Sequence, residues 1–235
     1  MDVRNDILSY DEIETSALIP KKFDRSKIIL KIEGILKRML DIFGGICGVV
    51  MLIPLTIGVW IANKLSKDKG PIFYTQERIG QNGKIFKMYK YRSMVVGADE
   101  KLKEYLENNV GAREEYKKFK KLKNDPRVTK IGKFIRKTSL DEFPQFINVL
   151  KGEMSLVGPR PYLPREKEEI NGFFKYITAC KPGITGLWQT RGRSNTTFTD
   201  RLTMDMEYYY NHELKMDIKL IYKTVRNVVK KEGAI

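Results

Sequence analysis

The sequence has almost none of the residues that disulfide frameworks and histidine-based sites require. Its 235 residues include two cysteines, Cys47 and Cys180, and a single histidine, His212. Two cysteines do not make the framework of a small secreted domain, so a reducing cytoplasm fits the chain better. One histidine cannot build a catalytic triad or a histidine-based metal site. His212 lies in the polar stretch YYYNHEL, where we expect a surface or helix-end position.

Acidic residues are scarce relative to basic ones. The chain has 44 lysines and arginines against 29 aspartates and glutamates, a formal net charge of +15. This excess predicts an anionic partner: nucleic acid, an anionic lipid surface or phosphorylated small molecules. No zinc spacing, RNA-binding signature or recognition helix is found in the sequence, so nucleic acid is not the expected partner.

Long apolar segments are also scarce, and the chain has only one. Residues 42–62 carry no charge, and a helix of this length rises about 30 Å, enough to cross a bilayer. Pro54 removes a backbone hydrogen bond, so the helix should kink or break there. Lysines and arginines flank both ends, which places both ends on one membrane face. We therefore predict a re-entrant membrane helix; an ordinary kinked span, a buried core helix and a signal peptide are the alternatives.

Composition and periodicity divide the chain into three parts. Residues 1–25 lack periodicity and are predicted to form a flexible tail. Residues 26–66 are expected to form a basic amphipathic helix followed by the membrane helix, and residues 67–235 a cytoplasmic domain. The predicted fold is α+β and mostly helical. A membrane-embedded broken helix, a β-hairpin and amphipathic interfacial helices are expected around a small catalytic domain.

The remaining elements follow from turn signals and helical spacing. Asn82-Gly83 predicts a β-hairpin over residues 71–94, because both residues tolerate the left-handed backbone of a tight hairpin turn. Helices are expected over residues 98–123, 141–152, 200–212 and 217–231, with Gly111 as a point at which the first could be interrupted.

The strongest candidate for chemistry is the pair Asp141-Glu142. Pro144 lacks an amide hydrogen and is tolerated only in the first turn of a helix, so the pair should lie at a helix N-terminus. Carboxylates and phosphates are both stabilised at such a position. One carboxylate could attack phosphorus as a nucleophile, and the other could hold Mg²⁺. The alternative is structural, because Ser139 and Glu142 also match a capping box.

Four basic residues are candidates for binding phosphate. Arg136 precedes the acidic pair, and Arg160 lies in the stiff turn GPRP, which would orient its guanidinium group. Lys90 and Arg92 are two residues apart on a predicted strand, so they should share one face. An ordinary turn, or a strand that faces solvent or lipid, would explain these patterns equally well.

Four stretches carry a joint pattern: KRMLDIFGG, YTQERIGQNGKIFKMYKYRSM, DPRVTKIGKFIRKTSLDEFPQFINVLKGEMSLVGPRP and KPGITGLWQTRGR. An Asp/Tyr/Leu/Asp pattern near the C-terminus follows them. In these stretches and in their order, the chain from about Lys37 onward resembles the bacterial sugar transferases, which are monotopic polyprenyl-phosphate phosphoglycosyltransferases. The resemblance covers about four-fifths of the chain, beyond residue 30.

The resemblance implies a ping-pong reaction at the cytoplasmic face of the bacterial inner membrane, with both chain termini in the cytoplasm. An aspartate takes a phosphosugar from a nucleotide diphosphate sugar, here expected to be a UDP-sugar. A polyprenyl phosphate, expected to be undecaprenyl phosphate, then accepts it. Such a step begins exopolysaccharide, capsule, lipopolysaccharide or protein glycosylation pathways.

The resemblance also assigns roles to residues. Asp141 would be the nucleophile, and Glu142, together with Asp141, would hold the cofactor Mg²⁺. The implied phosphate-binding residues are Arg136, Arg160 and Lys90, and the implied nucleotide-sugar residues are Arg193, Asp200 and Arg201.

One departure from the family and two alternatives stay open. Relatives often have a Ser-Pro pair at the membrane break, whereas this chain has Ile53-Pro54. The protein could instead be an inactive membrane scaffold of a polysaccharide assembly, or a basic module that binds anionic lipids or nucleic acid. Anionic membrane lipids are expected partners in either case, and a homo-oligomer is compatible with the sequence.

Overall fold

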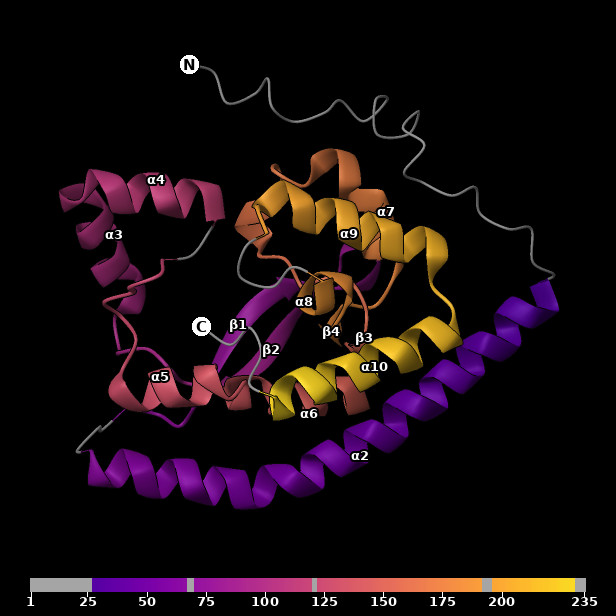
Figure 1. Cartoon of the computed structure of the whole chain (residues 1–235), viewed down its shortest axis with the longest axis horizontal. Coiled ribbons are helices and arrows are strands. Elements are labelled where there is room, and N and C mark those ends of the chain that lie inside the picture. The colour runs from indigo at the N-terminus through magenta and orange to yellow at the C-terminus, as the bar shows by residue number, and fades with distance from the viewer. Residues whose placement is uncertain (1–26, 67–69, 120–121, 192–195, 231–235) are drawn as a thin grey trace.

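The computed structural model describes residues 27–66, 70–119, 122–191 and 196–230. The expected α+β, mostly helical architecture is confirmed (Figure 1). The helices are α2 (Lys27–Leu65), α3 (Ala98–Asn108), α4 (Val110–Phe119), α5 (Lys130–Lys137), α6 (Gln145–Lys151), α7 (Phe174–Ala179), α8 (Leu187–Arg191), α9 (Phe198–Asn211) and α10 (Leu214–Val229). The strands are β1 (Phe73–Ile79), β2 (Ile85–Tyr91), β3 (Ser155–Val157) and β4 (Gly183–Thr185). The predicted tail, residues 1–25, lies outside the described residues.

The amphipathic helix and the apolar run, expected as two segments, form the single helix α2. It continues through Pro54 without a break and is bent along its length (Figure 1). Of the predicted kink or break at Pro54, the break is therefore not seen. Among the described residues, α2 is the one helix long and apolar enough to span a membrane, and most of its apolar side chains are exposed. This arrangement fits a membrane-anchored protein. Whether both ends of α2 lie on one membrane face stays a prediction.

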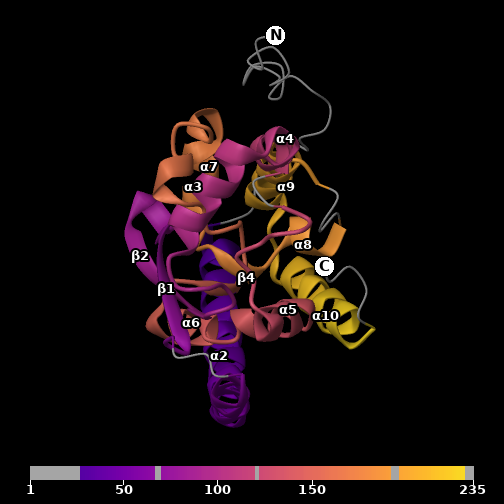
Figure 2. The ribbon, with the colours of Figure 1, turned by 90° about the vertical axis from the view of Figure 1, so that its left-hand side faces the viewer.

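The remaining helices form two groups relative to α2. Both views place α5, α6 and α10 near α2, whereas α3, α4, α7 and α9 lie on the opposite side of the molecule (Figures 1 and 2). The helix expected over residues 98–123 is two helices, because Asn109 adopts an extended backbone between α3 and α4. The last two helices, α9 and α10, begin two to three residues earlier than predicted.

The predicted hairpin is confirmed. Strands β1 and β2 pair antiparallel from Phe73 opposite Tyr91 to Ile79 opposite Ile85. Asn82 and Gly83 have φ of 56° and 75°, the left-handed backbone that the Asn-Gly signal predicts.

A second, parallel pair was not expected from the sequence. Strands β3 and β4 pair Ser155 with Gly183 and Val157 with Thr185. A Cβ atom at Gly158 or Gly183 would collide with the backbone of the facing segment, so glycine permits this close approach. The pair holds the GPRP turn against the glycine-rich stretch that leads into α8.

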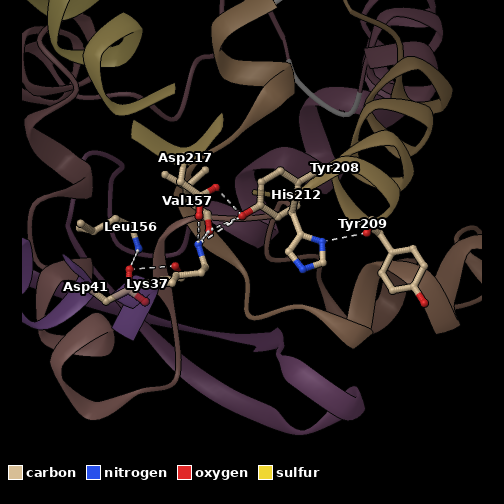
Figure 3. A network of polar contacts seen from close by, with 9 residues as sticks. Lys37, Asp41, Leu156, Val157, Tyr208, Tyr209, His212 and Asp217 are labelled. Atoms are coloured by element: carbon tan, nitrogen blue, oxygen red, sulfur yellow. Dashed lines mark hydrogen bonds and ion pairs between the residues drawn. The ribbon is translucent and has the colours of Figure 1, made fainter. Parts of the chain in front are cut away.

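The half-buried Lys37 and the buried Asp41 anchor the first half of α2 to the rest of the protein (Figure 3). Lys37 Nζ lies 2.6 Å from Asp217 Oδ2 and donates to the Val157 carbonyl oxygen at 2.9 Å. The Tyr208 hydroxyl donates to the other Asp217 oxygen at 2.8 Å. One turn further along α2, Asp41 accepts a hydrogen bond from the Leu156 amide at 2.8 Å. These contacts connect α2, β3, α9 and α10. His212 lies at the C-terminal end of α9, as expected.

Glycines let the middle of α2 approach α6. A Cβ atom at Gly45 or Gly48 would collide with the side chains of Leu150 and Phe146, respectively. Because these two positions lack side chains, α2 packs directly against α6, the helix that follows Asp141-Glu142.

Candidate active site

Asp141 and Glu142 lie in a 3₁₀ turn, Leu140–Glu142, between α5 and α6. The predicted helix begins at Gln145 rather than at Asp141, with Pro144 directly before it. The pair therefore stands one turn ahead of α6. This correction leaves both carboxylates close to the helix N-terminus, as Pro144 predicts.

The capping-box alternative is wrong for this turn. Ser139 has φ of 56° and ψ of 18°, and its side chain makes no capping hydrogen bond. A left-handed backbone is uncommon for serine and costs about 1–3 kcal/mol where the surrounding structure imposes it. The strained residue lies two positions before Asp141, so it sets the direction in which the acidic pair emerges from α5.

Apolar packing supports the turn from one side. Leu140 and Phe143, which flank the acidic pair, pack against a cluster that contains Leu52 and Val59 of α2 and Tyr91 of β2. The acidic pair is thus carried on a segment that rests on the second half of α2. This arrangement places the candidate chemistry next to the membrane-type helix.

The charges around Asp141 come from three elements. Burial raises the pKa of Asp141 to about 6, and the Glu142 carboxylate also raises it, whereas Lys90 and Arg136 lower it. Lys90 Nζ lies 3.6 Å from Glu142 Oε1. Arg136 Nε donates to Ser93 Oγ at 2.8 Å, which holds its guanidinium group near the turn. The structure therefore brings four of the predicted site residues together: Asp141, Glu142, Lys90 and Arg136.

Arg92 does not join this group. Its guanidinium group donates to the carbonyl oxygens of Pro71 at 2.6 Å and Met94 at 3.0 Å. It is buried and ties together the two ends of the hairpin, whereas Lys90 points towards Glu142. The expectation that Lys90 and Arg92 point together is thus wrong in this structure. A phosphate-binding role for Arg92 stays a prediction.

The acidic pair can take part in a Mg²⁺ site without completing one. Within the described ranges, no group of three or more histidine, cysteine, aspartate or glutamate side chains could hold a metal ion. Mg²⁺ in phosphoryl-transfer sites commonly takes one or two carboxylates and fills its other positions with substrate phosphate and water. The Glu142 charge that raises the pKa of Asp141 shows that the two carboxylates repel, and a cation would relieve this repulsion.

A second basic cluster is formed by Arg78, Arg160 and Arg201 around Trp188. The guanidinium carbons of Arg160 and Arg201 lie 5.4 and 5.2 Å from the centroid of the Trp188 ring. Burial, followed by repulsion from Arg160, lowers the pKa of Arg78 to about 10. Among the residues that the structure describes, the buried Nε atoms of Arg78 and Arg160 have no hydrogen-bond partner, and neither has the indole N–H of Trp188. Buried donors without acceptors predict that an anion binds here.

Asp205 holds the GPRP turn in this cluster. It is fully buried and accepts hydrogen bonds from the Tyr162 hydroxyl at 2.7 Å and the Arg160 amide at 3.1 Å. Burial raises its pKa to about 7, although these two hydrogen bonds and the charges of Arg160 and Arg201 lower it. Asp205 therefore fixes the backbone that presents Arg160.

The other predicted nucleotide-sugar residues are placed differently. Asp200 forms a capping box with Thr197: the Thr197 amide donates to Asp200 Oδ2 at 2.8 Å, and the Asp200 amide donates to Thr197 Oγ1 at 3.1 Å. Arg193 lies outside the described residues. Thus only Arg201 of the three is seen close to Arg160.

Sequence reasoning missed several residues that shape both clusters. Trp188 gave a signal, a lone indole next to glycines, but no specific chemistry. Asp205 and Asp217 lie in the C-terminal region where the family resemblance includes an Asp/Tyr/Leu/Asp pattern, but the pattern assigned no role to them. Lys37 and Asp41 carried the clearest signal, because charged residues four apart at the edge of an apolar run need partners.

The bacterial sugar transferase family model matches residues 32–231. The chain belongs to this family. An undecaprenyl-phosphate galactose phosphotransferase of Salmonella typhimurium is 48% identical over 202 residues, which cover 85% of this chain and 41% of that protein. The exopolysaccharide production protein ExoY of Sinorhizobium fredii is 39% identical over 220 residues, 94% of this chain and 96% of that protein.

A third relative extends the range of sugars. A UDP-glucose:undecaprenyl-phosphate glucose-1-phosphate transferase of Escherichia coli is 37% identical over 202 residues, 83% of this chain and 40% of that protein. The chain thus spans about two-fifths of the first and third of these relatives, and nearly all of the second. The named donors are those of the relatives, and they differ in the sugar.

Proposed function

We propose that the protein transfers a sugar 1-phosphate from a nucleotide diphosphate sugar to a polyprenyl phosphate. A UDP-sugar is the expected donor and undecaprenyl phosphate the expected acceptor, as in the relatives' names. The observation that carries the proposal is the strained turn at Ser139, which presents Asp141 between Lys90 and Arg136 beside the membrane-type helix. Membership of the sugar transferase family supports the same reaction class.

The first half-reaction uses Asp141 as nucleophile. A carboxylate oxygen of Asp141 attacks the sugar-bearing phosphorus of the donor, and a new P–O bond forms. The bond between that phosphorus and the bridging oxygen breaks, so a nucleoside monophosphate leaves. No neighbouring base is needed, because the carboxylate is ionised above a pKa of about 6. Lys90 and Arg136 stabilise the negative charge that spreads over the phosphoryl oxygens.

The second half-reaction returns the aspartate. A phosphate oxygen of the polyprenyl phosphate attacks the same phosphorus, and the bond to Asp141 breaks, which gives a polyprenyl diphosphate sugar and a free carboxylate. Asp141 and Glu142 would hold Mg²⁺, which supplies charge neutralisation at the transferred phosphate. The Arg160–Arg201–Trp188 cluster would hold phosphate of the nucleotide. The buried Arg78, close enough to be repelled by Arg160, would add positive charge there.

The exposed apolar side chains support a location on the membrane surface. Phe134 of α5 and Ile218, Tyr222 and Val225 of α10 are exposed, and α5 and α10 lie on the same side of the molecule as α2 (Figure 1). Lysines lie beside them in sequence, and each can add about 1 kcal/mol of attraction to an anionic leaflet. We place the protein on the cytoplasmic face of a bacterial inner membrane, where a long lipid phosphate is reached without extraction.

The proposal is tested by a donor screen with the purified protein in lipid nanodiscs. UDP-galactose, UDP-glucose and UDP-N-acetyl sugars are supplied with undecaprenyl phosphate and Mg²⁺, and release of UMP and formation of the lipid product are measured. We expect one donor to give equal amounts of both products, and Asp99→Asn, an exposed acid on α3, to match the wild type. A protein that releases no nucleoside monophosphate from any donor would support the scaffold alternative instead.

A further inference from the structure

The turn of α2 that contains Pro54 lies next to a partly buried hydrogen-bond network that the transfer reaction does not use. Pro54 has no amide hydrogen, so the helix loses one backbone hydrogen bond in this turn. Two residues further on, Thr56 Oγ1 donates to the Leu52 carbonyl oxygen at 2.7 Å. Such a bond from a threonine to the carbonyl one turn earlier commonly bends a helix.

The Tyr91 hydroxyl completes the network from another element. It lies 2.6 Å from Thr56 Oγ1 and 3.4 Å from the Leu52 carbonyl oxygen. Either hydroxyl group can be the donor in the bond between Thr56 and Tyr91, and each lies within hydrogen-bond distance of the Leu52 carbonyl oxygen. Tyr91 is 1% exposed and stacks on Phe73, with the ring centroids 5.4 Å apart. The hairpin thus reaches the bend with a rigid, buried side chain.

The same tyrosine also contacts the catalytic turn. Its ring belongs to the apolar cluster that includes Leu52 and Val59 of α2 and is covered by Leu140 and Phe143, on either side of Asp141-Glu142. Its neighbour in β2 is Lys90, which lies against Glu142. One residue therefore links the bend of α2, the turn with the nucleophile and the lysine beside it.

We propose that Thr56 and Tyr91 are positioning residues whose hydroxyl groups clasp α2 at its bend and fix its direction relative to the Asp141 turn. The Tyr91 side chain is buried in the apolar cluster, so little water competes for its hydrogen bond with the half-buried Thr56. Without the clasp, the part of α2 after Pro54 is free to straighten. The consequence for the lipid acceptor rests on the proposed function, whereas the effect on the shape of α2 does not.

Distance measurement across the bend tests the clasp without reference to activity. Cys47 is exposed in α2 before Pro54, and Leu65, at the end of the helix, is 80% exposed. Spin labels at Cys47 and at Leu65→Cys, in a Cys180→Ser background in nanodiscs, report the distance between the two halves. Thr56→Val and Tyr91→Phe remove one hydroxyl each, Thr56→Ser keeps the hydroxyl, and Tyr89→Phe removes an exposed hydroxyl from the same strand.

We expect longer and broader distances in Thr56→Val, Tyr91→Phe and the double variant, with the double variant no worse than either single one. Thr56→Ser and Tyr89→Phe should match the parent. Thr56→Val and Tyr91→Phe should each lower kcat/KM for the polyprenyl phosphate about tenfold. Both should leave UMP release in the absence of acceptor unchanged. Unchanged distances in Thr56→Val and Tyr91→Phe would overturn the clasp, even if both variants melt at a lower temperature. Changed distances in a protein with no transferase activity would support the clasp and refute the proposed function alone.

Discussion

The two basic clusters of the protein differ in what their cations face. Around Asp141, Lys90 and Arg136 surround a carboxylate whose burial raises its pKa. Around Trp188, Arg160 and Arg201 lie together with Arg78, and within the described part of the chain buried N–H groups there have no acceptor. The first arrangement is suited to making and breaking a bond, and the second to binding an anion brought by the substrate. Both arise from the same charge excess, so net charge alone does not separate catalysis from binding.

Among the substitutions that test the difference between the two clusters, Asp141→Asn should have the largest effect. If Asp141 is the nucleophile, its amide cannot attack phosphorus, and we expect UMP release to fall by about 10³-fold or more. Donor binding should persist, because the Arg160–Arg201–Trp188 cluster is intact. Calorimetry with the UDP-sugar measures donor binding, and an assay of UMP release measures the chemical step. Equal turnover by Asp141→Asn and the wild type would remove Asp141 from the chemistry.

Substitutions in the second cluster should act mainly on donor affinity. Arg160→Ala and Arg201→Ala each remove a charged donor, so we expect kcat/KM for the nucleotide sugar to fall about 10- to 100-fold, with most of the change in KM. Arg160→Lys should rescue poorly, because lysine lacks the planar fork. Steady-state kinetics with Arg113→Ala, an exposed arginine of α4, as control measure the effect. A loss confined to kcat would instead place Arg160 at the transferred phosphate.

The pH dependence of kcat/KM should respond to charges around Asp141 and not to charges around Trp188. The Asp141 carboxylate must be ionised, so kcat/KM for the donor should fall about tenfold per pH unit below a pKa of about 6 and level off above it. Glu142 raises this pKa and Lys90 lowers it. Glu142→Gln should therefore move the midpoint to lower pH, and Lys90→Met to higher pH. Arg160→Ala should leave the midpoint in place, and a shift there would join the two clusters electrostatically.

The smallest effect concerns stability. Burial raises the pKa of Asp205 from its ordinary value of 3.8 to about 7 in the folded protein, so the folded state binds more protons than the unfolded state between about pH 4 and 7. Stability should therefore fall as pH rises through this range, by about 1–3 kcal/mol. Thermal melting at pH 5 and pH 8 should show a smaller decrease for Asp205→Asn than for the wild type. An equal decrease in both would assign the pH dependence to other groups.

The residues explain which features the sequence could predict. Asn82-Gly83 and Pro144 impose local backbone geometry, so the hairpin and the approximate place of the acidic pair followed from them directly. The course of α2 could not be predicted in this way. In the sequence, Lys37 and Asp41 mark the edge of the apolar run, so two separate segments were expected. In the structure these two residues are paired with Asp217 and with the Leu156 amide, and the helix continues past them.

The features that escaped prediction depend on distant contacts. Strands β3 and β4 have three residues each, too few for periodicity, and form because glycines let two backbones approach. Serine gives no signal for the left-handed backbone at position 139, which the surrounding packing imposes. Arg92 looked like a partner of Lys90 until the hairpin ends supplied carbonyl oxygens for its guanidinium group.

The most direct test of the account is the mass of the intact protein after incubation with its UDP-sugar donor and Mg²⁺, without acceptor. The account predicts a gain equal to one phosphosugar, mapped by peptide analysis to Asp141 and absent from Asp141→Asn. The gain should disappear when undecaprenyl phosphate is added. An adduct on another residue, or full turnover by a protein that never carries an adduct, would contradict the central claim.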